Sequence, residues 1–369
     1  MPTARRGTGT ADGSDRPVRG IAVAARLRSQ LLAGSPADSV EEVVGRLLAV
    51  QAQDGRGARL AVRSRSRGLS AADVDLALSR DRSLVVTWLN RGTLHLVRSE
   101  DYFWLHRLTA PRLATGSARR LRQEGVDARQ AARGVELIAA AVTDDGPQTR
   151  EQLRQRLRAA GVPTASQALV HLLRAASTQG IVLRGPMVGT EHAFVAVEQW
   201  LGAAPAALDH ETALGRLARR YLDGHAPAGP DDLAKWAGIP LGDARVGFAA
   251  MNEKLVSLGQ GLFALGALVD EPLPRAAPRL LGPFDPLLHG WASREPFVGP
   301  HAHVVTTNGI FRPVALVDGR VVATWGLPGG RPTVAALVPL SGRTRRALSA
   351  DGTDVLRFLG LPPSPVRFE

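Results

Sequence analysis

Apolar residues recur at helical spacing over the first hundred positions of the chain. Residues 40–48 carry them at intervals of three and four, which predicts one buried face of a helix. Ser39 precedes this run and Glu42 follows three residues later, which is the pattern of a capping box. A helix over residues 20–34 and another starting at Ser70 complete a set of three.

Two short β-prone runs, residues 84–89 and 93–97, follow these helices. Three helices with a hairpin are typical of a winged helix, and residues 20–125 are therefore expected to form the first such unit with its connecting helices. The same order recurs in residues 126–205 and in residues 206–272, without visible sequence identity. The chain is expected to hold three tandem winged-helix units.

Residues 273–369 follow a different pattern. Prolines punctuate their beginning, β-rich runs follow, and Asp318-Gly319 is a strong hairpin signal. We expect a small antiparallel β-barrel or sheet with a C-terminal segment, with Arg312 and Arg320 on one face. The fold class is therefore α+β. Residues 1–19 are polar and rich in arginine, glycine and aspartate, and are expected to be a disordered leader.

The composition narrows the classes of function. No apolar run approaches the roughly 18 residues that span a membrane, and there is no cysteine, which excludes disulfides, thiolate metal sites and iron–sulfur clusters. These features predict a cytoplasmic protein. The net charge of +12 indicates a polyanionic partner. Almost all of the positive charge is arginine, because Lys235 and Lys254 are the only lysines; a merely soluble, arginine-rich protein is the other interpretation.

Gln51 extends the apolar stripe of residues 40–48 by one step, so a polar amide occupies a position expected to be apolar. Gln53 lies two positions further on and would point about 200° away if the helix continued. If the helix ends near Val50 and the chain becomes extended, both amides face the same way. Asp54-Gly55 and Gly57 favour such an ending. The alternative is that Gln51 is a satisfied buried amide and Gln53 a solvated one.

Three strings carry a resemblance to a known family. They are LAVQAQD at residues 48–54, WLNRGTLHLV at residues 88–97 and PFDPLL at residues 283–288. In this order they resemble the bacterial winged-helix DNA glycosylases of the AlkZ type, over about residues 20–365. The resemblance implies tandem winged helices around a β-barrel, a concave basic channel for DNA, and catalytic Gln51 and Gln53. The leader has no counterpart in it.

The resemblance also implies a reaction. The Gln-x-Gln form of the motif is linked in that family with excision of bulky adducts and interstrand cross-links, and with resistance to alkylating natural products. The expected activity is monofunctional hydrolysis of the N-glycosidic bond of N7-alkylated purines, which are cationic and need no general acid. Gln53 would orient the water and Gln51 the sugar-facing carbonyl, or the reverse. Asp54 is an alternative base.

Further side chains could support the site. His95 either points toward DNA phosphate or makes a structural hydrogen bond to backbone, and Asp285 is either catalytic support or a turn residue. His301 and His303 alternate along an expected strand without a third ligand, so we expect no metal. No cofactor is expected. The arginines expected at DNA are Arg63, Arg65, Arg67, Arg91, Arg312 and Arg320, and a further group including Arg150 lines a helix.

The expected partner is double-stranded DNA with an alkylated purine, bound by a monomer, with no membrane and no nucleotide cofactor. Two other classes account for part of the sequence. A non-enzymatic winged-helix transcriptional regulator explains the charge and the repeated units, but not the Gln-x-Gln pair. A protein-interaction scaffold predicts no salt-sensitive DNA binding.

Overall fold

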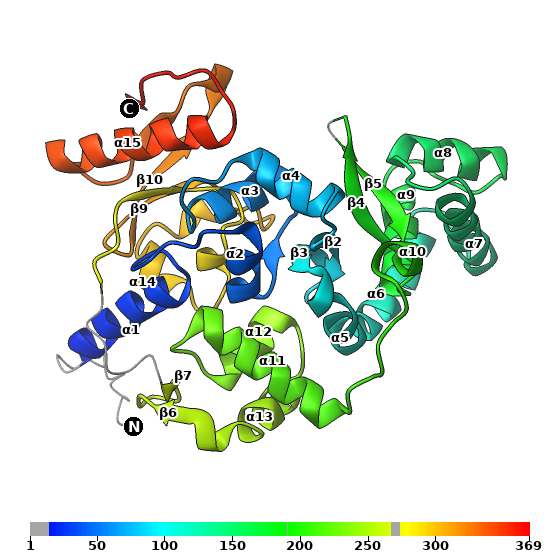
Figure 1. The fold of residues 1–369 in the computed structure, drawn as a ribbon, viewed down its shortest axis with the longest axis horizontal. Helices are drawn as coiled ribbons and strands as arrows, with labels where there is room; N and C mark the ends of the chain where they lie inside the picture. The colour runs from blue at the N-terminus through cyan, green and yellow to red at the C-terminus, as the bar shows by residue number, and fades with distance from the viewer. Residues whose placement is uncertain (1–14, 190, 267–273) are drawn as a thin grey trace, which may run out of the picture.

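The first set of helices forms around the apolar stripe. A computed structural model describes residues 15–189, 191–266 and 274–369 (Figure 1). The set consists of α1 (Asp15–Ser29), α2 (Val40–Leu47), α3 (Gly55–Arg63) and α4 (Ala71–Ser79). Helix α1 begins five residues before its predicted start, so residues 15–19 of the expected leader are helical, and the rest of that leader lies outside the described residues.

Capping explains where two of these helices begin. The hydroxyl of Ser39 accepts the amide hydrogen of Glu42 at 3.1 Å, while the Glu42 carboxylate accepts from the backbone of Asp38, one residue earlier than predicted. At α4 the Asp73 carboxylate accepts from the backbone nitrogen of Ser70 at 2.7 Å, as the capping box predicts. Both helices therefore start where the sequence signals place them.

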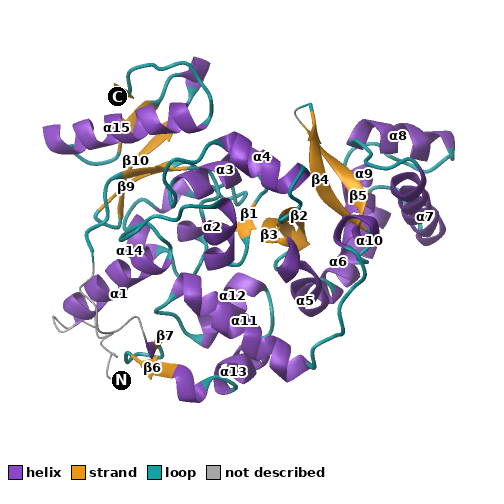
Figure 2. Cartoon of the chain, viewed as in Figure 1, coloured by secondary structure: helices purple, strands orange, loops and turns teal. Residues whose placement is uncertain are grey.

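One five-stranded sheet occupies the middle of the molecule (Figure 2). Its strands are β1 (Val50–Gln51), β2 (Leu84–Leu89), β3 (Thr93–Arg98), β4 (Val182–Val188) and β5 (Glu191–Ala196), in the order β1-β3-β2-β4-β5. The two hairpins expected in separate units are thus joined, because β2 pairs with β4 at Val86 and Arg184. Strand β2 is buried along its whole length, and five of its six residues are apolar.

Helices surround this sheet. After β3 come α5 (Ser99–Thr109), α6 (Pro111–Gln123), α7 (Ala128–Asp144), α8 (Arg150–Ala159) and α9 (Ala168–Thr178), and α10 (Val197–Leu201) follows β5. The third set comprises α11 (His210–His225), α12 (Pro230–Ala237) and α13 (Leu241–Ala249), followed by the hairpin of β6 (Leu255–Ser257) and β7 (Phe263–Leu265). Among the described residues, no helix is both long and apolar enough to cross a membrane.

The C-terminal region forms an open sheet, so the predicted β-barrel is wrong. Its strands are β8 (Arg279–Leu281), β9 (Val314–Val317), β10 (Arg320–Gly326), β11 (Thr333–Ala336) and β12 (Arg367–Phe368), and β8 and β12 are its opposite edges. The pair β11–β12 is parallel rather than antiparallel. His303, expected on a strand, lies instead in a 3-10 turn (Ala302–Val304).

Helix α15 explains why the C-terminal sheet does not need to close. The remaining helices of this region are the short α14 (Glu295–Val298) and α15 (Gly342–Phe358). Leu348 and Val355 of α15 share a hydrophobic cluster with Leu280, Ala315 and other residues of the sheet. One face of the sheet is therefore buried under a helix, and Figure 1 shows α15 lying along it.

Candidate active site

The Gln-x-Gln motif lies at the end of α2, where the chain turns and becomes extended. Helix α2 ends at Leu47, Leu48 adopts a turn conformation with a positive φ of 63°, and β1 follows. Gln51 pairs with His95 of β3, and the amide of Ala52 donates to the carbonyl of Leu94 at 2.7 Å. The helix therefore ends before Val50, which is the condition that the sequence analysis set for the two amides to face the same way.

The two amides differ in exposure. Gln51 is 5% exposed, whereas Gln53 is exposed to solvent. Val50 and Ala52, the residues that alternate with Gln51, pack in one hydrophobic cluster. Gln51 consequently lies on the other side of the strand, because successive side chains of an extended chain point to opposite faces.

Arg91 holds the Gln51 amide. Its Nη2 donates to Gln51 Oε1 at 3.4 Å, and its Nη1 donates to the carbonyl of Trp236 at the end of α12. Burial lowers the pKa of Arg91. The contact restricts the orientation of Gln51, and one lone pair of its carbonyl oxygen stays free for a second partner.

Two neutral histidines lie close to this contact. Burial, followed by the positive charge of Arg91, lowers the pKa of His95 to about 3 and that of His289 to about 4. His95 Nδ1 lies 2.9 Å from the carbonyl oxygen of Thr93, and His289 Nε2 lies 2.9 Å from that of Phe284. Of the two interpretations of His95, the structure shows the backbone hydrogen bond. His289 carried no sequence signal that separates it from an ordinary loop histidine.

The two candidate carboxylates have local structural roles. Asp54 caps α3, because its Oδ1 accepts the amide hydrogen of Gly57 at 2.6 Å. A Cβ at Gly57 would overlap the carbonyl oxygen of Pro283, so this position requires glycine. Asp285 caps a 3-10 turn through the amide of Leu287 at 3.0 Å and is fully buried, as the turn-residue interpretation predicts.

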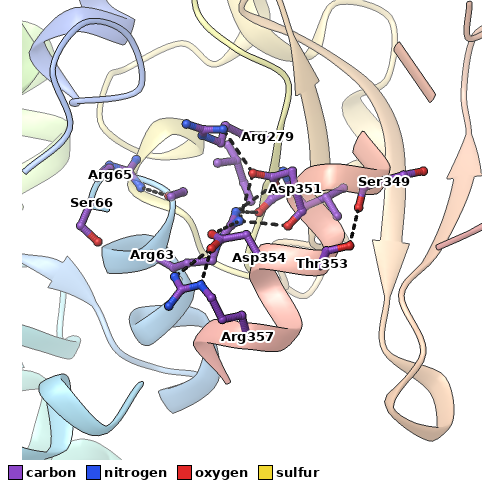
Figure 3. Close-up of polar contacts among 12 residues, drawn as sticks. Arg63, Arg65, Ser66, Arg279, Ser349, Asp351, Thr353, Asp354 and Arg357 are labelled. Atoms are coloured by element: carbon purple, nitrogen blue, oxygen red, sulfur yellow. Dashed lines mark hydrogen bonds and ion pairs between the residues drawn. The ribbon is translucent and has the colours of Figure 1, made fainter. Parts of the chain in front are cut away.

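Two arginines expected at DNA are buried, so those expectations are corrected. Arg63 donates to both carboxylate oxygens of Asp351 on α15 and to the carbonyl of Leu280, and Figure 3 shows Arg63 and Arg279 converging on that helix. Arg65 pairs with Asp285 in the interior. Ion pairing with residues far along the chain holds both guanidinium groups away from solvent.

The other arginines are more accessible. Arg67, Arg312 and Arg320 are exposed, and Arg67 pairs with Asp38 on the surface. Arg91 is partly buried against Gln51. These four stay candidates for DNA contacts.

A cavity of about 710 Å³ opens beside Gln53. It lies between α3 and α4 on one side and the β4–β5 hairpin on the other, and Gln53 is one of its lining residues. Its charged lining residues are Arg56, Arg59, Asp75, Arg150, Arg184 and Glu191. Apart from Arg150, these residues were not singled out in the sequence, because the cavity brings together elements that lie far apart in the chain.

The described residues contain no group of three or more histidine, cysteine, aspartate or glutamate side chains that could hold a metal ion. The rings of His301 and His303 contact each other edge to face with centroids 6.0 Å apart.

Comparison with known proteins defines the class. A sequence model of the AlkZ-like DNA glycosylases matches residues 44–358, a span that includes the Gln-x-Gln motif, and the chain belongs to this family. The family and the enzyme class, DNA glycosylase, are confirmed as the sequence analysis expected them.

Particular relatives extend this result. The chain is similar to an interstrand DNA cross-link repair glycosylase of Streptomyces sahachiroi, with 28% identity over 364 residues that cover 93% of this chain and 96% of the relative. Its fold matches the solved structure of the Streptomyces sahachiroi DNA glycosylase AlkZ with a TM-score of 0.77 and 27% identity, covering 95% of this chain and 99% of the other. The mixed α+β architecture is thus shared along nearly the whole chain.

Proposed function

We propose that this protein hydrolyses the N-glycosidic bond of N7-alkylated purines in double-stranded DNA without cutting the strand. Bulky natural-product adducts and interstrand cross-links are included among the proposed substrates, and self-resistance or repair in the cytoplasm is the proposed role. The observation that carries the proposal is the placement of the motif. Gln53 is exposed at an arginine-rich cavity, while Gln51, two residues earlier, is buried and held by Arg91.

Two amides suffice for this reaction. An N7-alkylated purine is already cationic, so it leaves as a neutral base with the electron pair of the C1′–N bond, and water adds to C1′ and releases its proton to solvent. The protein has to stabilise the positive charge that develops on the sugar and to orient the water. A carbonyl dipole performs both tasks when packing fixes it beforehand.

The contact with Arg91 indicates which amide faces the sugar and which one orients the water. A guanidinium 3.4 Å from Gln51 Oε1 opposes a cation that develops on the same side. We therefore assign the sugar-facing carbonyl to Gln53 and the water to Gln51, which reverses the order first expected.

We further propose that the three sets of helices with their hairpins act as winged-helix units on DNA and that the protein works as a monomer. Exposed arginines, among them Arg67, Arg312 and Arg320, would contact phosphate groups. Such contacts give affinity with a steep dependence on salt and little sequence preference.

The test uses a duplex with one N7-methylguanine, followed by heating in alkali to cleave any abasic site. The wild-type protein is expected to cause scission at that position. Gln51→Ala and Gln53→Ala are each expected to slow excision by about a hundredfold or more while DNA affinity changes only a few-fold. Gln155→Ala, which removes an exposed amide on α8, is the matched control and is expected to behave as wild type. No scission by folded wild-type protein, or equal loss of DNA binding in both variants, would contradict the proposal.

A further inference from the structure

The cavity beside Gln53 carries an excess of positive charge. Its lining contains four arginines and two carboxylates, those of Asp75 and Glu191. His192 also lines it and adds no charge at neutral pH, because burial lowers its pKa. The balance therefore favours an anion inside the cavity.

Arg184 is one of the partly buried cations of this lining. It lies on β4, and its guanidinium lies over the rings of Trp88 and Phe194, 5.2 and 5.4 Å from their centroids. Its Nε is buried without a hydrogen-bond partner, and among the described residues no carboxylate forms an ion pair with it. Burial and then the charge of Arg150 lower the pKa of Arg184 to about 10, while the charge of Glu191 opposes this shift, so Arg184 stays protonated at neutral pH. A partly buried cation that forms no ion pair is stabilised when an anion binds to it.

Another arginine of the cavity lining, Arg59, is neutralised by an ion pair. Arg59 pairs with Asp75 of α4, with Arg59 Nε 3.0 Å from Asp75 Oδ1. Arg150, the first residue of α8, has no such partner within the described part of the chain, although it lies close enough to influence Arg184. Among the described residues, Arg56, Arg150 and Arg184 form no ion pair, and Arg150 and Arg184 lie close enough to each other to interact.

We propose that Arg150 and Arg184 bind a phosphodiester group of the DNA strand that carries the damaged nucleotide, and so hold its sugar at Gln53. This inference rests on the proposed function. A guanidinium matches a phosphate with two parallel hydrogen bonds, and the aromatic rings under Arg184 keep its fork in one orientation. Because Gln53 lines the same cavity, the second hairpin and the segment between β1 and α3 contribute to one site.

Inorganic phosphate shares the chemistry of a phosphodiester, so the experiment separates the two. Binding of an undamaged duplex is followed by fluorescence anisotropy over a series of salt concentrations for wild type, Arg184→Met and Arg150→Met. Each substitution is expected to weaken binding by about tenfold at low salt and to reduce the slope of log affinity against log salt by about one. Arg184→Lys keeps the charge and is expected to retain most of the slope.

Arg133→Met is the matched control, since Arg133 is an exposed arginine of α7 paired with Glu136 and lies outside the cavity lining. Its salt slope is expected to stay as in wild type. Thermal unfolding checks that each variant is folded. If Arg184→Met does not fold, the test rests on Arg150→Met, which changes the first residue of α8. The inference is overturned if both cavity variants keep the salt slope of wild type. It is also overturned if inorganic phosphate stabilises wild type and Arg184→Met abolishes this effect while duplex binding stays unchanged.

Excision of N7-methylguanine by the same preparations separates this inference from the proposed function. If wild type does not excise the base but the cavity variants show a smaller slope of log affinity against log salt, the proposed reaction is contradicted and the phosphate site is supported. If wild type excises the base and the slopes are unchanged, the phosphate site alone is wrong.

Discussion

Arg65 and Asp285 form a two-pronged ion pair in the interior of the protein. The two contacts are 2.8 and 2.9 Å long, and both side chains are 0% exposed. Arg65 also donates to the side-chain oxygen of Gln30 at 2.9 Å, so the segments that follow α1, α3 and β8 meet at one guanidinium. The PFDPLL string that carries part of the family resemblance therefore has a structural task at Asp285.

Asp285→Ala is expected to destabilise the protein by about 3–5 kcal/mol, because it leaves the Arg65 charge buried without a partner. Urea unfolding followed by circular dichroism measures this. Asp38→Ala is the matched control, because the Arg67–Asp38 pair has both side chains 71% exposed and is worth about 0–1 kcal/mol. Similar losses in the two variants would contradict a structural role for the buried pair.

Buried neutral histidines predict a loss of stability in acid. Burial lowers the pKa of His95 and His225 to about 3 and that of His289 to about 4. In the unfolded chain each histidine binds a proton with a pKa near 6.5, whereas in the folded chain it does so only at lower pH. The stability of the fold is therefore complete above pH 6.5 and decreases as the pH falls toward the folded pKa values. Each histidine is expected to lower the free energy of unfolding by about 1–2 kcal/mol as the pH falls from 6.5 to 5.

His289→Gln is expected to make the free energy of unfolding less steep in pH over this window, as measured by urea unfolding at several pH values. His303→Gln, at an exposed position, is the control and is expected to leave the pH dependence unchanged. An equal slope in wild type and His289→Gln would show that His289 titrates normally in the folded protein.

Local signals predicted the parts of the fold that depend on neighbours in the chain. The stripe of α2 and the capping box at Ser70 are both present, since each is set by residues within a few positions. Helix α3 was missed because its sequence is dominated by arginine and glycine. Arg65 reaches a partner 220 positions away, and no local pattern contains that information. The β-barrel prediction was wrong for a related reason. Helix α15 buries the face of the C-terminal sheet that a closed barrel would have buried.

The candidate site was predicted to a similar extent. A glutamine in an apolar stripe pointed to Gln51, and the turn after α2 was expected from the glycines that follow. The contact between Arg91 and Gln51 and the approach of Arg184 to the cavity beside Gln53 depend on strand pairing. That pairing joins Val86 to Arg184 across nearly a hundred residues of chain, so the second hairpin's part in the site became visible only in the structure.

Arg91 is expected to act through Gln51. Arg91→Met removes the donor to Gln51 Oε1 and is expected to lower the single-turnover excision rate about ten- to a hundredfold, because a loosened amide is misplaced. In a double-mutant cycle the Gln51→Ala/Arg91→Met protein is expected to be no slower than Gln51→Ala alone. Additive losses would mean that Arg91 acts on DNA independently of Gln51.

Borohydride is expected to trap no covalent protein–DNA adduct during excision of N7-methylguanine. A Schiff base at the abasic sugar requires an amine, and the chain's two lysines, Lys235 and Lys254, are exposed residues outside the lining of the cavity beside Gln53. The measurement is gel electrophoresis of the borohydride-treated reaction, with a lyase-active glycosylase as positive control. A trapped species that persists in Lys235→Arg/Lys254→Arg would point to the N-terminal amine, and one that disappears would place a lysine at the reacting sugar; either result would contradict strand-preserving hydrolysis by the two amides.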